Sequence, residues 1–103
     1  MYKIEKIEEP RIFRDTQGTA SSLTVDLHVR APKKSAEYWT VYVGQLRLWK
    51  GGGLSFSIIW IPSMAWGNSA YRTPPVDYDR TDIKEFVMQA CKTEIQQWQD
   101  KLL

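Results

Sequence analysis

The sequence predicts an α+β fold, in which a four-stranded antiparallel sheet is followed by one C-terminal helix that packs on one face of the sheet (β-β-β-β-α). Apolar and polar residues alternate along residues 22–30 and again along residues 54–61. A period of two is typical of strands with one buried face. Over about residues 81–101 the apolar residues instead recur at the spacing of an amphipathic helix.

Length and composition indicate one domain that spans residues 1–103. The chain is 43% hydrophobic and 25% charged, with a net charge of +2. So small a positive charge permits nucleic-acid binding but does not by itself argue for it. The single cysteine, Cys91, excludes a disulfide within this chain and disfavours thiolate metal binding. The sequence shows no signal peptide and no apolar run of membrane-spanning length, so we expect a cytoplasmic protein without cofactors, metal or membrane contact.

The first two strands differ in regularity. Residues 2–14 form an irregular strand that Pro10 interrupts, which predicts an edge position or a bend. Residues 15–19 are a turn cluster. Residues 22–30 then place one set of side chains on a packed face and the other on a wet face, as an antiparallel sheet allows. The packed set is Leu23, Val25, Leu27 and Val29, and the wet set is Thr24, Asp26, His28 and Arg30.

The third and fourth strands are joined by a glycine turn. In residues 37–49 the apolar positions change phase at Gly44, which predicts a β-bulge there. Before the change Trp39, Val41 and Val43 share one face, and after it Leu46 and Leu48 take over. Residues 51–53 are all glycine and suit a tight hairpin reversal into residues 54–61. Pro62 is expected to end the fourth strand, because proline donates no ladder hydrogen bond.

A long loop and a helix complete the chain. Residues 62–79 are expected to form a loop, and loops of this length in a compact domain are often functional. Asp79 or Thr81 is suited to cap the following helix, which runs to about Lys101. Its apolar stripe is Ile83, Phe86, Val87, Ala90, Cys91, Ile95, Trp98 and Leu102.

Three short motifs resemble the SpoVG family, the septation-regulator proteins of bacteria. Residues 45–48 read Gln-Leu-Arg-Leu, residues 52–56 read Gly-Gly-Leu-Ser-Phe and residues 61–63 read Ile-Pro-Ser. They stand where the family has an aliphatic strand, a glycine turn into Gly-Leu-Phe and Met-Pro-Ser. Pro75, Arg80 and Ile83 fall close to the family's proline, basic residue and first helical isoleucine, so the likeness covers roughly residues 40–98.

The resemblance implies a small cytoplasmic dimer that binds DNA, or RNA, and regulates gene expression without catalysis. Basic residues that lead into the C-terminal helix would make the contact. Arg80 is the matching position, and Lys84 lies one turn further on. The chain departs from the family over residues 64–73, where Trp66 and Tyr71 replace a mainly polar stretch.

A phosphate-binding surface is the first candidate site. The alternative is that its residues are ordinary solvated charges, because acidic residues within three positions of Arg80 would neutralise it. The candidates are Arg30, Lys33, Lys34, Arg47, Arg72, Arg80 and Lys84, with Lys50 as a further basic residue near Arg47.

Aromatic residues suggest two further contacts. Tyr38 and Tyr42 are suited to stack on bases if they lie on an open sheet face, or else to pack against a partner subunit or loop. Trp66 and Tyr71 are candidates for an interaction loop, or else cover one end of the sheet.

No pattern in the chain indicates catalysis. His28 and Asp26 share a strand face but lack a nucleophile or a metal partner, and the glycines of residues 51–53 do not open a helix as a phosphate loop does. Apolar groups on both faces of residues 38–49 predict a homodimer. We therefore expect a nucleic-acid-binding regulator. The alternative is a phage or accessory protein that binds a protein partner through the aromatic loop and an exposed sheet edge.

Overall fold

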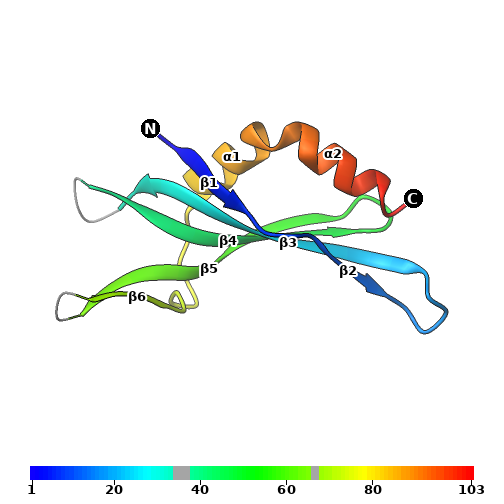
Figure 1. The fold of residues 1–103 in the computed structure, drawn as a ribbon, viewed down its shortest axis with the longest axis horizontal. Helices are drawn as coiled ribbons and strands as arrows, with labels where there is room; N and C mark the ends of the chain where they lie inside the picture. The colour runs from blue at the N-terminus through cyan, green and yellow to red at the C-terminus, as the bar shows by residue number, and fades with distance from the viewer. Residues whose placement is uncertain (34–37, 66–67) are drawn as a thin grey trace.

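The computed structural model describes residues 1–33, 38–65 and 68–103. It shows an α+β fold in which two C-terminal helices lie along one face of a sheet (Figure 1). The described residues form six strands and two helices, so the expectation of four strands and one helix is wrong in number. The elements are β1 (Lys3–Ile7), β2 (Arg11–Arg14), β3 (Ala20–Pro32), β4 (Trp39–Trp49), β5 (Leu54–Ala65), β6 (Asn68–Arg72), α1 (Thr81–Ala90) and α2 (Lys92–Asp100).

The strands follow the order β1-β3-β4-β5-β6, and β2 also pairs with β3. Every pair is antiparallel. β1 and β2 share one edge of β3, since β1 pairs with its residues 27–30 and β2 with its residues 20–24. The predicted interruption at Pro10 is confirmed, because β1 ends at Ile7 and β2 begins at Arg11.

The predicted long loop is in part a β-hairpin. β5 continues through Pro62 to Ala65, and β6 returns along it with Ile61 opposite Arg72 and Pro62 opposite Tyr71. Pairing between β5 and β4 has already ended at Trp60. Pro62 therefore lies where β5 is paired on one side only, and there the missing N–H of proline is tolerated.

The bulge predicted at Gly44 occurs at that level of the sheet but in the neighbouring strand. β4 pairs with β3 without interruption, whereas its register against β5 shifts between Val43 opposite Trp60 and Gly44 opposite Ile58. The extra residue is Ile59 of β5. Gly44 serves a different purpose, because a Cβ atom there would lie 2.2 Å from Cζ of Phe56. The glycine makes room for that ring.

The hydrophobic core lies between the sheet and the helices. The packed face predicted for β3 is confirmed, and it meets Tyr42, Leu46 and Leu48 of β4 and the helix stripe. Ala90 of the predicted stripe is instead exposed. The two helices are separate because Cys91 leaves helical geometry at φ −105° and ψ 22°. The core cluster comprises Leu23, Val25, Leu27, Val29, Ala31, Tyr42, Leu46, Leu48, Ile61, Ile83, Val87, Cys91, Ile95, Trp98 and Leu102.

Neither helix of the described chain has the length and apolar character needed to cross a membrane.

Candidate nucleic-acid interface

The face of the sheet opposite the helices, called the open face here, carries polar and aromatic side chains. Residues of β3 that alternate with the core residues point to it, and they include Asp26, His28 and Arg30. The register with β4 places Gln45 and Arg47 on the same face.

Two matching tetrapeptides flank β3 at one end of this face. Residues 11–14 of β2 read Arg-Ile-Phe-Arg, and residues 47–50 at the end of β4 read Arg-Leu-Trp-Lys. Both follow the pattern basic, aliphatic, aromatic, basic. Their aliphatic residues stand on either side of the buried Leu23 on the helix side, so each first arginine and each ring point to the open side.

The strand register places these side chains in two rows. Thr24 stands between Arg11 and Arg47, and Ser22 stands between Phe13 and Trp49. This region is called the Phe13–Trp49 surface; it consists of Arg11, Phe13, Ser22, Arg47 and Trp49 around the buried Thr24, with Arg14 and Lys50 at its rim.

Both rings of this surface are accessible. The exposed fraction is 48% for Phe13 and 40% for Trp49. Gly53 supports the Trp49 ring on one side, since a Cβ atom there would lie 3.2 Å from Cε3 of the indole. Adjacent strands are about 4.8 Å apart, so the two rings rise from backbones about 10 Å apart with the small Ser22 between them.

The charges of the surface are only partly neutralised. The Arg11 guanidinium contacts the Asp26 carboxylate at 3.1 Å. Arg47 instead donates from Nε to the Thr24 hydroxyl at 3.4 Å, and its guanidinium carbon lies 5.9 Å from the Trp49 ring centroid. Among the ion pairs of the described residues, none involves Arg14, Arg47 or Lys50. Arg47 is therefore an unneutralised cation of the open face, and Arg14 and Lys50, which follow the rings in sequence, add positive charge at its rim.

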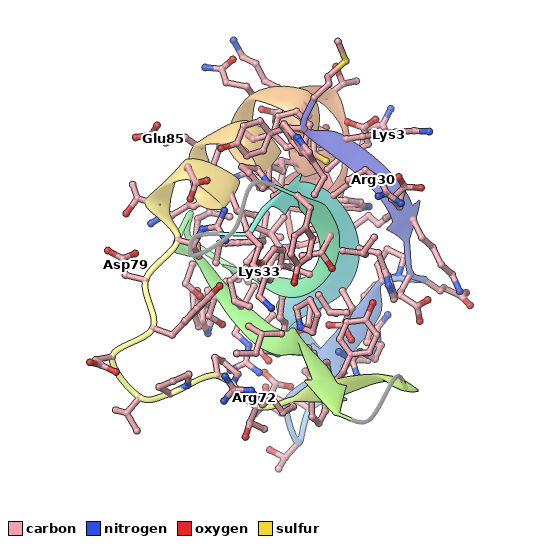
Figure 2. The ribbon with its side chains drawn as sticks, turned by 90° about the vertical axis from the view of Figure 1, so that its left-hand side faces the viewer. Lys3, Arg30, Lys33, Arg72, Asp79 and Glu85 are labelled. Carbon is pink, nitrogen blue, oxygen red and sulfur yellow. The ribbon has the colours of Figure 1, made fainter. Side chains whose placement is uncertain are left out.

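The remaining predicted basic residues do not join this surface. Arg30 lies on the open face but six residues from Thr24 along β3, or about 20 Å, and it pairs with Glu5 at 2.8 Å. Lys33 lies over the Tyr38 ring at 5.4 Å. Lys34 lies outside the described residues. In Figure 2, viewed along the long axis, Arg30 lies beside Lys3. Arg72 lies apart from them, on the side of the molecule away from the helices.

The Arg80 side chain is buried, and its guanidinium already donates hydrogen bonds within the protein. Only 3% of its side chain is exposed. Its Nε and Nη2 atoms donate to the two carboxylate oxygens of Asp82, each at 2.9 Å, and Nη2 also donates to the Pro32 carbonyl at 2.8 Å. Lys84, one turn later on α1, is exposed and remains available. Arg80 connects the start of α1 to the end of β3, and we leave it out of the proposed contact surface.

The Arg80 pair shifts the pKa values of its neighbours. Its hydrogen bonds hold the pKa of Asp82 well below the usual range, although partial burial opposes this, and Asp82 raises the pKa of Arg80. The Tyr2 hydroxyl donates to Asp82 at 2.7 Å, which raises the pKa of Tyr2. Tyr42 lies beneath the Arg80 guanidinium, 4.9 Å from ring centroid to Cζ, and burial raises its pKa to about 12.

The predicted stacking residues have different surroundings. Tyr42 is 2% exposed and belongs to the core, so the structure contradicts a stacking role for it. Tyr38 is 48% exposed, and its hydroxyl accepts a hydrogen bond from Lys33 at 3.0 Å. Phe13 and Trp49 are accessible rings on the open face for which sequence reasoning proposed no role. The repeated tetrapeptide pattern was the available signal, but its meaning depends on the pairing of both segments with β3.

The structure describes only part of the predicted interaction loop, and Tyr71 belongs to the described part. Trp66 lies outside the described residues. Tyr71 lies on β6, half-exposed, and helps to line a hollow of about 400 Å³ in the open face. The other lining residues are Glu8, Asp26, His28, Val43 and Trp60.

The surroundings of the acidic, histidine and cysteine side chains bear on two kinds of chemistry, metal binding and thiol reactivity. No group of three or more His, Cys, Asp or Glu suited to a metal ion occurs within residues 1–33, 38–65 and 68–103. Cys91 is buried against the core, and this burial raises the pKa of its thiol. A thiol in such surroundings is a poor nucleophile.

Comparison of this chain with protein-family models, with curated proteins and with solved structures gives no match.

Proposed function

We propose that this protein is a non-catalytic nucleic-acid-binding protein that acts in gene regulation and contacts DNA or RNA through the Phe13–Trp49 surface. The observation that carries the proposal is Arg47. Its guanidinium is exposed, lies beside the Trp49 ring and faces no carboxylate among the described ion pairs. A free cation beside an accessible ring suits a phosphate and the base attached to it.

Local charge supports this proposal better than total charge. The net charge of the chain is only +2. At the Phe13–Trp49 surface, however, Arg47 has no acidic partner among the described ion pairs, and the likewise unpaired Arg14 and Lys50 lie at the rim of that surface, at the ends of two hairpins. A phosphate chain that crosses this end of the sheet would release counterions from several cations at once, which is the main source of affinity in such complexes.

The likeness to the SpoVG family is part of this proposal. Its first two motifs lie on β4 and on the glycine turn into β5, and Ile-Pro-Ser lies further along β5. A homodimer in the cytoplasm belongs to the same proposal. Exposed apolar side chains such as Trp39, Leu54 and Trp60 support association of two copies, and the lone buried Cys91 suits a reducing compartment.

A titration at two salt concentrations tests the proposal. Fluorescein-labelled DNA and RNA oligonucleotides of mixed sequence are titrated with protein at about 50 and about 200 mM salt, and anisotropy is measured. We expect binding that weakens as salt rises, and Arg47→Ala should lower affinity and reduce the salt slope by about 1. Lys92→Ala, an exposed lysine at the start of α2 on the opposite side, is the matched control. Absence of binding to both oligonucleotides at the lower salt overturns the proposal.

A protein-binding function is the second candidate, and the hollow that Trp60 and Tyr71 line favours it. Those side chains are 42% and 50% exposed, and Val43 lies beside them. Accessible aromatic residues beside a hollow are typical anchor points for a protein partner. Binding of a protein partner through such a contact should depend only weakly on salt, whereas oligonucleotide binding through phosphates should weaken as salt rises.

A further inference from the structure

We infer that the Phe13–Trp49 surface selects single-stranded nucleic acid and that two unpaired bases of one strand stack on its two rings. This inference rests on the proposed function and adds the class of nucleic acid. It follows from the spacing of the rings, from the residue between them and from the position of the cations.

The spacing of the two strands that carry the rings disfavours paired bases. Phe13 and Trp49 rise from strands on either side of β3, with backbones about 10 Å apart. Successive bases in a duplex strand are only about 3.4 Å apart along the axis and are covered on both faces. Bases that lie on both rings must therefore be spread apart and unstacked from their neighbours. Unpaired strands allow this, whereas a duplex must first be opened.

The floor between the rings is small and polar. Ser22 lies opposite both Phe13 and Trp49, and it is half-buried. Its hydroxyl makes no hydrogen bond to another described residue, unlike Ser21, whose hydroxyl donates to the Phe13 carbonyl at 3.0 Å. Ser22 thus leaves space between the rings and offers one free donor and acceptor to a sugar or a base edge.

Two cations lie beside the aromatic row on the open face. Arg11 and Arg47 flank Thr24 in the next row of the open face, toward the centre of the sheet. Arg14 and Lys50 come directly after the rings in sequence and are exposed, but the alternation of the strands directs them to the other side of the sheet, at the rim of this surface. A strand that crosses β2, β3 and β4 along the aromatic row keeps its phosphates within reach of Arg11 and Arg47 while its bases lie on the rings.

The inference is tested with an oligonucleotide of about 12 nucleotides, a length that small domains bind. One sample is the labelled strand without self-complementarity, and the other is the same strand annealed to its complement. Anisotropy is measured at one salt concentration with the wild-type protein. We expect clearly tighter binding to the single strand. Equal or tighter binding to the duplex overturns the inference.

Ring variants supply the second test. Trp49→Ala and Phe13→Ala should each weaken single-strand binding about 5- to 150-fold, the range for loss of one stacked base. The salt slope should stay the same, because neither ring carries charge. Trp49→Phe and Phe13→Tyr keep a ring and should bind within a few-fold of wild type. Trp49→Leu keeps apolar bulk without a ring and separates stacking from packing, and melting temperatures confirm that each variant is folded.

The outcomes separate this inference from the proposed function. If Arg47→Ala weakens binding while the ring variants bind as wild type does, the proposed function stands and the inference is overturned. If wild-type protein binds neither the strand nor the duplex, both are overturned.

Discussion

The carboxylate of Asp82 accepts two hydrogen bonds of 2.9 Å from the guanidinium of Arg80. This guanidinium also stacks over the ring of Tyr42, with Cζ 4.9 Å from the ring centroid. The same guanidinium reaches back 48 residues to the Pro32 carbonyl. One side chain therefore holds the first turn of α1 to the end of β3, and Arg80 has a structural role.

Removal of this guanidinium should destabilise the fold. We expect Arg80→Ala to lower the free energy of unfolding by about 2–4 kcal/mol, because Asp82 and the Pro32 carbonyl lose charge-assisted hydrogen bonds. Lys84→Ala, an exposed change on the same helix, should stay within about 0.5 kcal/mol of wild type. Urea denaturation measures both. A folded Arg80→Ala protein with wild-type stability and weakened nucleic-acid binding would show that Arg80 serves the ligand instead.

The Arg80 pair should also make stability depend on pH. The pKa of Asp82 is lowered in the folded state from an ordinary value of 3.8, so the unfolded chain takes up the proton first as pH falls. The stabilisation is therefore fully present above about pH 4 and is lost as pH falls below it toward the folded-state pKa. Asp82→Asn should differ in stability from wild type more at pH 7 than at pH 3, as measured by urea denaturation. Asp77→Asn, an exposed change in the preceding loop, is the control, and an equal Asp82→Asn effect at both pH values contradicts the prediction.

Gly44 and Phe56 should behave as a coupled pair. A Cβ atom at Gly44 would meet the Phe56 ring at 2.2 Å, so Gly44→Ala should cost about 1–3 kcal/mol of stability through overpacking. Phe56→Leu removes the colliding end of the ring. In a double-mutant cycle the two changes together should cost less than the sum of the single changes. Strict additivity in thermal or urea unfolding would show that the ring moves aside freely.

Arg30 and Arg47 should contribute unequally to nucleic-acid binding. Arg30 is paired with Glu5 at 2.8 Å, whereas Arg47 has no acidic partner among the described ion pairs. We expect Arg30→Ala to change the salt slope by clearly less than the value of about 1 expected for Arg47→Ala. Glu5→Gln should tighten binding by removing a negative charge from the open face. Equal slopes for the two arginine variants refute this order.

Self-association is the last prediction. Trp60 is 42% exposed on the open face, beside the accessible Tyr71, and a contact between two copies would bury both. Sedimentation equilibrium should detect a dimer at tens of micromolar, and Trp60→Lys should shift it toward monomer. Ser57→Lys, an exposed change on the same strand, controls for added charge. A wild-type protein that is entirely monomeric at this concentration rules out the homodimer.

The local pattern of residues was sufficient for much of this fold. The period of two from Leu23 to Val29 correctly predicts which face of β3 is buried, and Pro10 marks the break between β1 and β2. The apolar stripe that ends at Trp98 and Leu102 correctly predicts a helical C-terminus. These features depend on neighbours within a few positions along the chain, and the sequence therefore displays them directly.

Long-range pairing determined the rest. β6 has no strand period of its own that distinguishes it from a loop, and it forms because β5 offers an edge beyond Trp60. The burial of Arg80 depends on Pro32, which is far away in sequence. The Phe13–Trp49 surface exists only because β2 and β4 take the same register on either side of β3. A shift of one residue in either pairing would turn a ring toward the core. The sequence alone determined which residues are apolar, aromatic and basic, and only the tertiary structure decided which of them meet.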